Sequence, residues 1–292
     1  MESLKQRKKH IFLSAHLDDA VFACGGLIAK AVSLGCPVEV ITFYTKQIDP
    51  ETLPAQQAKT AIYDQRKDED RAALEVLGAK PIWADFTERF IRPPWLPNAL
   101  HIFRTPLTGT MYDFDNAASI EQYISELILG NPEAQFFVSL SVGNHYDHVE
   151  LFLCSLKTAI DLGLLHRFTF YEEGYALGTR MRRRHYVTQH ACWKWWEAPA
   201  TRSIRWLIMS NIMASQARGR PVYEYLPEEY RNIHWAVKSE SIHGYEEMKL
   251  GAMSKYRSQY DMLGGERMFG RILDQYHKYW GGAEPYWYAQ EM

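Results

Sequence analysis

Cysteine is scarce in this sequence. The 292 residues contain four cysteines, and no two of them form a C-x-x-C pair. Small secreted domains held by disulfides are dense in cysteine, and thiolate zinc sites use closely spaced cysteine pairs. The cysteine content therefore argues against both arrangements and predicts a reduced, cytoplasmic protein.

Charge of one sign and long apolar runs are also missing. Lys and Arg number 33 against 35 Asp and Glu, for a net charge of -2. Nucleic-acid-binding domains usually carry a basic excess, so we expect no nucleic-acid partner. The basic start, Met1 to His10, precedes an apolar run that is interrupted at His16 and Asp18. This run is too short for a signal peptide or a membrane anchor, and we expect no integral membrane segment.

Two widespread catalytic motifs are absent. Gly25 and Gly26 are not part of a G-x-G-x-x-G dinucleotide loop, and neither Ser14 nor Ser139 lies in the G-x-S-x-G motif of serine hydrolases. What the chain does have is apolar and aromatic residues: 47% are hydrophobic and 14% aromatic, including 9 Trp and 18 Tyr. That composition is sufficient for a sizeable core.

Short apolar strands alternate with amphipathic helices along the first half of the chain. We predict strands at 10–15, 37–44, 81–83, 135–140 and 168–171, and helices at 20–34, 56–77, 119–129, 149–162, 245–260 and 266–279. Alternation with short connections is typical of βαβ units and a parallel sheet. The sequence predicts an α/β, Rossmann-like three-layer fold, with a mostly parallel sheet and helices on both faces.

The character of the chain changes near residue 177. We expect one domain over 1–292, with a core at about 8–176 and an aromatic-rich C-terminal cap with further helices at about 177–292. The basic run Arg180 to Arg184 is usually a solvated face, with contact to a substrate phosphate as the alternative. Trp193, Trp195 and Trp196 suit a core or an oligomer contact, or stacking on a sugar ring.

A first polar group, His16, Asp18 and Asp19, comes directly after the first predicted strand. In open α/β sheets, ligands bind outside the carboxyl ends of the strands. Clustered ionisable groups at a buried strand end are costly unless something neutralises them. The simpler alternative is that an aspartate only caps the following helix.

A second polar group, His145, Asp147 and His148, follows the strand at 135–140 and precedes a helix. Two strand-end loops can meet over one edge of the sheet. Together they would supply imidazoles and carboxylates, which suit a zinc ion with an open coordination position. A capping Asp147 with surface histidines is the alternative.

Five separated motifs resemble the PIG-L (LmbE-like) deacetylases. His16-Leu17-Asp18-Asp19 with Gly25-Gly26 resembles the A-H-P-D-D-x5-G-G signature, and His145 to His148 resembles H-P-D-H. The others are the Arg66 to Gly78 segment, Tyr171 to Tyr175, and the set Lys249, Ala252, Tyr256, Ser258 and Gln259. Leu17 and Tyr146 stand where the family usually has proline, and the region 178–245 shows no family pattern.

The resemblance implies a role for each residue of the two groups. His16, Asp19 and His148 would hold zinc, or another divalent cation, and leave room for water and a substrate carbonyl. Asp18 would act as general base. His145 would stabilise the oxyanion, with Asp147 orienting its ring.

Arg66 and Asp85 are the main candidates for substrate binding. The resemblance implies that Arg66 contacts substrate hydroxyls or phosphate; an ion pair with Asp70 on the helix surface is the alternative. Asp85, after the strand at 81–83, is a candidate acceptor for a sugar hydroxyl. Glu172 and Tyr175 either support the metal loop or contact substrate.

The implied activity is zinc-dependent removal of the N-acetyl group from an amino sugar of the N-acetylglucosamine type in a small conjugate. One alternative is an amidase or deacylase of another N-acyl conjugate, such as a thiol conjugate or an acylated antibiotic sugar. The other is a carbohydrate-binding protein that has lost turnover. The expected partner is a small-molecule sugar conjugate; a homo-oligomer is left open.

Overall fold

The sheet is the centre of the molecule. The computed structural model describes residues 7–59, 61–93, 105–106, 108–173, 185, 187–188, 222–262 and 266–290. The strands are β1 (His10–Ser14), β2 (Val38–Thr42), β3 (Lys80–Trp83), β4 (Gln135–Ser139), β5 (Phe168–Tyr171), β6 (His234–Ser241) and β7 (Ala283–Gln290). They form one sheet in the order β3-β2-β1-β4-β5-β7-β6. The first five strands of this order are parallel, and β7 runs antiparallel to both of its neighbours.

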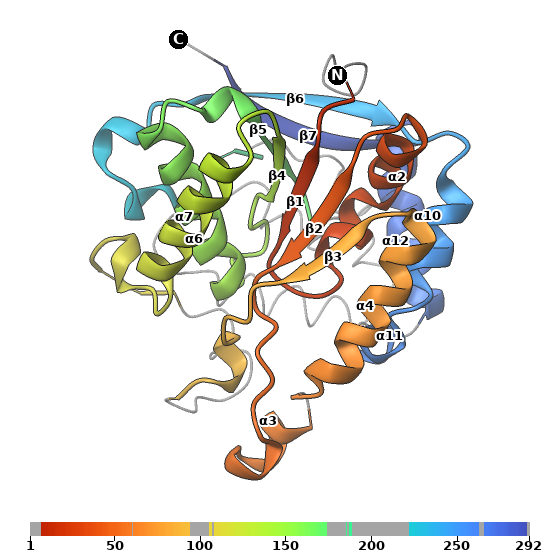
Figure 1. Cartoon of the computed structure of the whole chain (residues 1–292), viewed down its shortest axis with the longest axis horizontal. Coiled ribbons are helices and arrows are strands. Elements are labelled where there is room, and N and C mark those ends of the chain that lie inside the picture. The colour runs from red at the N-terminus through yellow and green to blue at the C-terminus, as the bar shows by residue number, and fades with distance from the viewer. Residues whose placement is uncertain are drawn as a thin grey trace.

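Helices cover both faces of the sheet. They are α2 (Asp19–Ser33), α3 (Ala55–Ala58), α4 (Tyr63–Leu77), α6 (Ala117–Gly130), α7 (Tyr146–Asp161), α10 (Glu246–Met253), α11 (Arg257–Met262) and α12 (Glu266–Tyr279). Figure 1 shows α6 and α7 on one side of the strands and α2, α4 and α10 on the other. This arrangement confirms the predicted three-layer α/β fold.

Alternating side chains on the strands build the two cores. Ile11 and Leu13 face a core shared with α6 and α7, whereas Phe12 faces the core shared with α2, α4 and α10. Successive residues of a strand point to opposite faces, so a strand covered on both sides is apolar throughout. Such continuous apolar runs are what made the central strands predictable.

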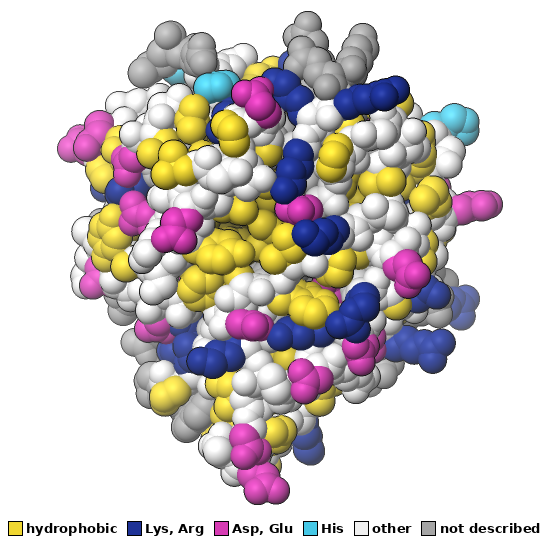
Figure 2. All heavy atoms as spheres, in the orientation of Figure 1, with side chains coloured by type: hydrophobic (Ala, Val, Ile, Leu, Met, Phe, Trp, Pro, Cys, Tyr) yellow, Lys and Arg dark blue, Asp and Glu magenta, His cyan; other side chains and the backbone are white. Residues whose placement is uncertain are grey.

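The molecular surface carries charges of both signs. On the face drawn in Figure 2, Lys and Arg side chains are interspersed with Asp and Glu, and hydrophobic side chains gather where Figure 1 places β3. Within the described part of the chain, no helix has the length and apolar character needed to cross a membrane.

Four segments differ from the sequence prediction. The helix expected at 56–77 is divided into α3 and α4, and Ala61 and Tyr63 pack with Leu17 in a small separate core. The helix expected at 245–260 is divided into α10 and α11, where Tyr256 is buried against Phe22. Strands β6 and β7 were not predicted; they extend the sheet from the region that the sequence placed in the cap.

Some predictions concern residues outside the described part of the chain. These residues are the basic run 180–184, the three tryptophans 193, 195 and 196, and Tyr175.

A buried ion pair compensates for an interruption in α2. Cys24 has non-helical dihedrals inside this helix. The amides of Gly26 and Leu27 donate to the Glu284 carboxylate over 3.0 and 2.7 Å, and Lys249 Nζ lies 3.4 Å from the carbonyl oxygen of Ala23. Lys249 and Glu284 are themselves 2.6 Å apart and almost fully buried. The pair thus supplies partners for backbone groups near the kink.

Candidate metal centre and active site

The two polar loops meet at the carboxyl ends of adjacent strands. β1 and β4 pair in parallel, so the loop that contains His16 to Asp19 lies beside the loop that leads into α7. The first loop is closed by its own hydrogen bonds: the His16 amide donates to Asp19 Oδ2 over 2.7 Å, and Ser14 Oγ donates to the His16 carbonyl over 2.7 Å. The loop geometry therefore directs the Asp19 carboxylate back towards His16.

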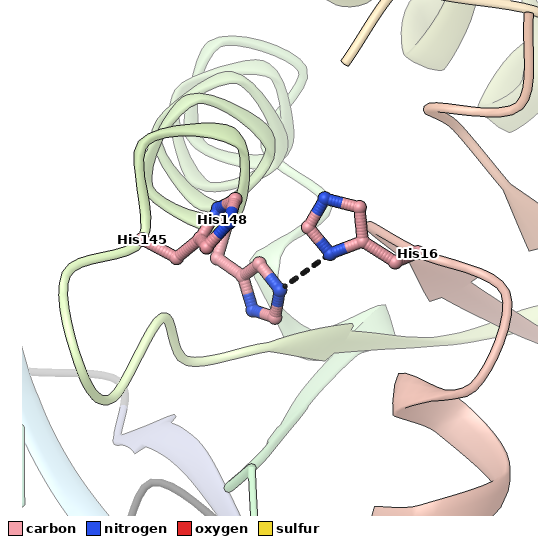
Figure 3. A group of neighbouring side chains, drawn as sticks. All are labelled: His16, His145 and His148. Carbon is pink, nitrogen blue, oxygen red and sulfur yellow. Dashed lines mark hydrogen bonds between the residues drawn. The ribbon is translucent and has the colours of Figure 1, made fainter. Parts of the chain in front are cut away.

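Three potential ligand atoms converge. His16 Nδ1 is 3.0 Å from His148 Nε2 and 3.4 Å from Asp19 Oδ2, and the last two atoms are 3.2 Å apart. Figure 3 shows the His16 ring, on the loop after β1, pointing toward His148 on α7, with His145 beside them. Donors about 2.0–2.1 Å from a tetrahedral zinc ion lie about 3.3 Å from one another. The three atoms therefore have the spacing that such an ion requires.

A carboxylate lies behind each of these two histidines. Asp147 Oδ2 is 3.2 Å from His16 Nε2, and Glu173 Oε1 is 2.8 Å from His148 Nδ1. A carboxylate at the remote nitrogen keeps a proton there and leaves the other nitrogen free to bind a metal ion. The arrangement thus prepares His16 Nδ1 and His148 Nε2 as ligands.

Asp147 does not take the role that the sequence suggested. Its Oδ2 atom is 3.9 Å from His145 Nδ1, which is too long for a hydrogen bond. The shorter contact is the one to His16, because the carboxylate is held from the other side by the Arg89 amide, over 3.1 and 3.0 Å, and by Arg92 Nη2, over 2.9 Å. Asp147 is completely buried.

The electrostatics of the cluster favour a cation at its centre. Burial alone would lower the pKa of His16, but Glu88, Asp147 and Asp19 raise it well above the usual value. Burial would likewise lower the pKa of His148, but Asp19 and Glu173 raise it to about 9. Without a metal ion, the carboxylates therefore favour the protonated form of both histidines. A divalent cation bound between them would neutralise the same negative charges.

Asp18 differs electrostatically from its neighbour Asp19. Burial and the charge of Asp19 raise the pKa of Asp18 to about 7. For Asp19, burial acts in the same direction, but His148 and His16 outweigh it and hold the pKa well below the usual value. A carboxyl group that titrates near neutral pH suits proton transfer, whereas a permanently ionised one suits metal binding.

His145 lies beside the possible ligands on a strained loop. Its ring centroid is 4.7 Å from that of His16. Burial and the neighbouring His16 lower the pKa of His145 well below the usual value, so the ring is neutral. Ser141 and Asn144 in the loop have φ values of 61° and 56°, which non-glycine residues rarely adopt. The Val142 amide donates to Glu173 over 2.9 Å and helps to hold this conformation.

The two candidate substrate residues occupy different surroundings. Arg66 is buried, with Nη1 3.6 Å from Glu88 Oε2, and Asp70 instead accepts hydrogen bonds from Trp83 and Tyr256. The alternative reading, an ion pair of Arg66 with Asp70 on the helix surface, is wrong, because the partner of Arg66 is Glu88.

Asp85 follows β3 in a left-handed conformation with φ 56°, and its side chain is 57% exposed. Its Oδ1 atom accepts hydrogen bonds from Thr45 and Lys67, over 2.9 and 2.7 Å. The residue is thus fixed at the same edge of the sheet as the two loops, but toward solvent.

Three residues that lie at the site were not predicted from the sequence. Glu173 belongs to the quoted 171–175 motif and was assigned no role, while its neighbour Glu172 instead accepts hydrogen bonds from Tyr276 and Trp287. Glu88 and Arg92 flank the short 3-10 helix η2 (Arg89–Ile91), and Glu88 Oε1 lies 3.9 Å from His16 Nε2. No motif or periodicity marks this segment.

Comparison with known proteins identifies the family. The family model described as PIG-L, GlcNAc-PI de-N-acetylase, matches residues 11–156, which is half of the chain and includes both loops. The chain belongs to the PIG-L family. Membership confirms the resemblance drawn from the motifs and the prediction of a deacetylase enzyme. No curated protein sequence matches the chain.

Several solved structures share the fold of this PIG-L family chain. A deacetylase of the teicoplanin biosynthesis pathway has a TM-score of 0.69 at 19% identity, covering 97% of this chain and 98% of its own. The A40926 pseudoaglycone deacetylase Dbv21 has a TM-score of 0.65 at 19% identity, with the same coverage. The 4-carboxy-2-hydroxymuconate hydratase GalB of Pseudomonas putida KT2440 reaches 0.52 at 12% identity, covering 98% of this chain and 97% of its own. Because a hydratase shares the fold, the reaction has to be argued from the site.

Proposed function

We propose that this protein is a metal-dependent N-deacetylase that removes the acetyl group from an amino sugar of the N-acetylglucosamine type in a small conjugate, with zinc as the metal. The observation that supports this most directly is the convergence of His16 Nδ1, Asp19 Oδ2 and His148 Nε2 next to Asp18. A bound zinc ion would lower the pKa of a water molecule to near 7 and polarise the amide carbonyl.

We propose that Asp18 carries out the proton transfers of the reaction. In the metal-free protein, burial and Asp19 raise the pKa of Asp18 to about 7, and a cation bound to Asp19 would favour the ionised form of Asp18, which can accept the proton of the attacking water. Once protonated, the same group is a suitable donor to the leaving amine. His145 is neutral and is a weaker candidate for that donation.

His145 is proposed to act as a hydrogen-bond donor. A neutral imidazole has one N–H group, and the position of this ring beside His16 and His148 suits a bond to the carbonyl oxygen as negative charge develops on it. Removing one such donor typically costs about 2.7–4 kcal/mol of transition-state stabilisation.

Arg66 and Asp85 are proposed to bind the sugar. The Arg66 guanidinium lies close enough to Asp18 to influence its pKa, so a substrate held by Arg66 would be near the general base. Asp85 is at the solvent side of the same sheet edge, where a carboxylate can accept sugar hydroxyls. The second candidate substrate is an N-acylated antibiotic sugar, favoured by the near full-length likeness to the teicoplanin and A40926 deacetylases.

Acetate release from a substrate panel tests the proposal. The panel would contain N-acetylglucosamine, its phosphatidylinositol conjugate, diacetylchitobiose and N-acylated glycopeptide sugars. We expect release from at least one of them, a loss of at least about 100-fold in Asp18→Asn with the metal still bound, and no change in Asp274→Asn, an exposed aspartate on α12. Full activity in Asp18→Asn would refute the general base. No product from any substrate would refute the function.

A further inference from the structure

We propose that Arg92 is a positioning residue of the metal site, which fixes the Asp147 carboxylate against His16 and thereby sets the orientation of this ligand ring. The inference rests on the proposed metal site and extends it to a residue outside every motif of the sequence.

The buried negative charge of Asp147 requires a positively charged side chain beside it. The carboxylate has no exposed surface, and an unpaired carboxylate in such a place is strongly unfavourable. Its hydrogen-bond donors are the Arg89 amide, Arg92 Nη2 and the ring of His16. Arg92 is the member of this set that carries a permanent charge on its side chain.

The two ends of the Arg92 guanidinium are held by different acids. Nη2 is 2.9 Å from Asp147 Oδ1, and Nη1 is 2.9 Å from Asp115 Oδ2. The guanidinium also lies over the Tyr146 ring, 5.4 Å from its centroid, and only 11% of the side chain is exposed. The bond from Nη2 to Asp147 is a hydrogen bond, whereas the contact of Nη1 with Asp115 is an ion pair without hydrogen-bond geometry. A planar, mostly buried group that is paired with a carboxylate at each end has little freedom, so it restrains the carboxylate to which it donates.

The restraint passes from Asp147 to the proposed ligand. Asp147 uses Oδ1 for Arg92 and Oδ2 for His16 Nε2, over 3.2 Å. Rotation of this carboxylate would break its hydrogen bond with His16 Nε2. The His16 ring could then rotate, and Nδ1 would no longer be held toward Asp19 and His148. Loss of a residue that orients a ligand in this way typically weakens metal affinity by about 10–100-fold.

Arg89 is a matched control. Its guanidinium also lies over the Tyr146 ring, at 5.3 Å, and 3.5 Å from Asp115 Oδ2. It reaches Asp147 through the backbone amide, which a substitution of the side chain leaves in place. Arg89→Gln therefore removes a comparable cation from the same ring without removing the side-chain bond to Asp147.

The test compares Zn²⁺ affinities of the purified full chain, measured by competition with a chromophoric chelator. We expect Arg92→Gln to lose about tenfold in affinity, Arg92→Lys to recover part of that loss, and Arg89→Gln to stay within about twofold of wild type. Thermal unfolding of each metal-free variant reports its fold separately. If Arg92→Gln fails to fold, the comparison between Arg92→Lys and Arg89→Lys decides, with a loss expected only in the first.

The outcomes separate this inference from the proposed function. Wild-type affinity in the folded Arg92 variants, or equal losses in the Arg92 and Arg89 variants, would overturn the positioning role. A wild-type chain that binds Zn²⁺ but releases no acetate would refute the proposed function and leave the Arg92 result standing. A wild-type chain that does not bind Zn²⁺ would overturn both.

Discussion

Two groups of buried charged residues lie along α2, one at its start and one at the kink near Cys24. Only the first has side chains arranged to bind a metal ion. The first is the metal cluster, defined as His16, Asp18, Asp19, Asp147, His148 and Glu173. The second is the Lys249–Glu284 pair at the kink. In that pair one carboxylate meets one ammonium at 2.6 Å, and two backbone amides complete the Glu284 contacts.

The difference shows how a site can be told from a structural ion pair. The Lys249–Glu284 pair balances its own charge. In the metal cluster, four buried carboxylates lie beside two imidazoles whose pKa values are raised against the effect of burial, and Arg92 is paired with one of these carboxylates, Asp147. A buried pair that is matched in charge and fully hydrogen-bonded needs no further partner, whereas buried carboxylates and imidazoles with perturbed pKa values and converging donor atoms mark a candidate functional site.

We expect the largest effect, on the free energy of unfolding, from a substitution that breaks the Lys249–Glu284 pair. Lys249→Met leaves Glu284 buried without its cation, and we expect a loss of about 3–5 kcal/mol in the free energy of unfolding. Urea denaturation of the metal-free protein measures it, with Lys255→Met, an exposed lysine two residues after α10, as the control. A loss below about 1 kcal/mol would mean that the pair is no more than a surface-like contact.

Asp70 is another buried carboxylate and differs from Glu284, because its two hydrogen-bond donors, Trp83 and Tyr256, are neutral. Burial raises the pKa of Asp70 to about 6 from 3.8. The folded state therefore binds the proton more tightly than the unfolded state, and stability falls as pH rises from about 4 to about 6. About two pKa units correspond to at most about 3 kcal/mol.

Asp70→Asn should remove this dependence. An amide can accept from Trp83 and donate to the Tyr256 hydroxyl, so the variant should gain stability relative to wild type as pH rises from 4 to 8. Denaturation at several pH values checks this, with the exposed Asp68→Asn on the same helix as the control. A difference between Asp70→Asn and wild type that does not vary with pH would contradict the assignment.

The smallest expected effect lies within the metal cluster. Glu173→Gln weakens the contact with His148 Nδ1, and we expect Zn²⁺ affinity to fall by about tenfold. Its neighbour provides the control, because Glu172 bonds to Tyr276 and Trp287 and Glu172→Gln should leave the affinity unchanged. Equal losses in both variants would show a general effect on this loop instead.

The core of the fold could be predicted because buried strands leave a clear pattern. β1, β4 and β5 are apolar on both faces, and the polar residues that follow β1 and β4 therefore stood out as loop residues at one edge. Asp18, Asp19, His145, Asp147, His16 and His148 were chosen as candidates in this way, with the family motifs in support, and the structure brings His16, Asp19 and His148 together.

Other parts left no such pattern. β6 is mostly exposed at the edge of the sheet, and β7 contains Pro285, so neither reads as a buried strand. Glu88 and Arg92 reach the site because the chain after β3 folds back over Tyr146 and His16, which depends on contacts distant in sequence. The sequence placed the Asp147 carboxylate beside His145 because the two residues are close in sequence, whereas its shorter contact is with His16.

Metal stoichiometry tests the central claim most directly. We predict that the purified chain binds one Zn²⁺ per molecule with high affinity, measured by metal analysis after dialysis and by chelator competition. His148→Ala should lose this ion, and His166→Ala, an exposed histidine at the opposite end of β5, should keep it. A chain that binds no Zn²⁺, or a His148→Ala variant that binds it as tightly as wild type, would contradict the account.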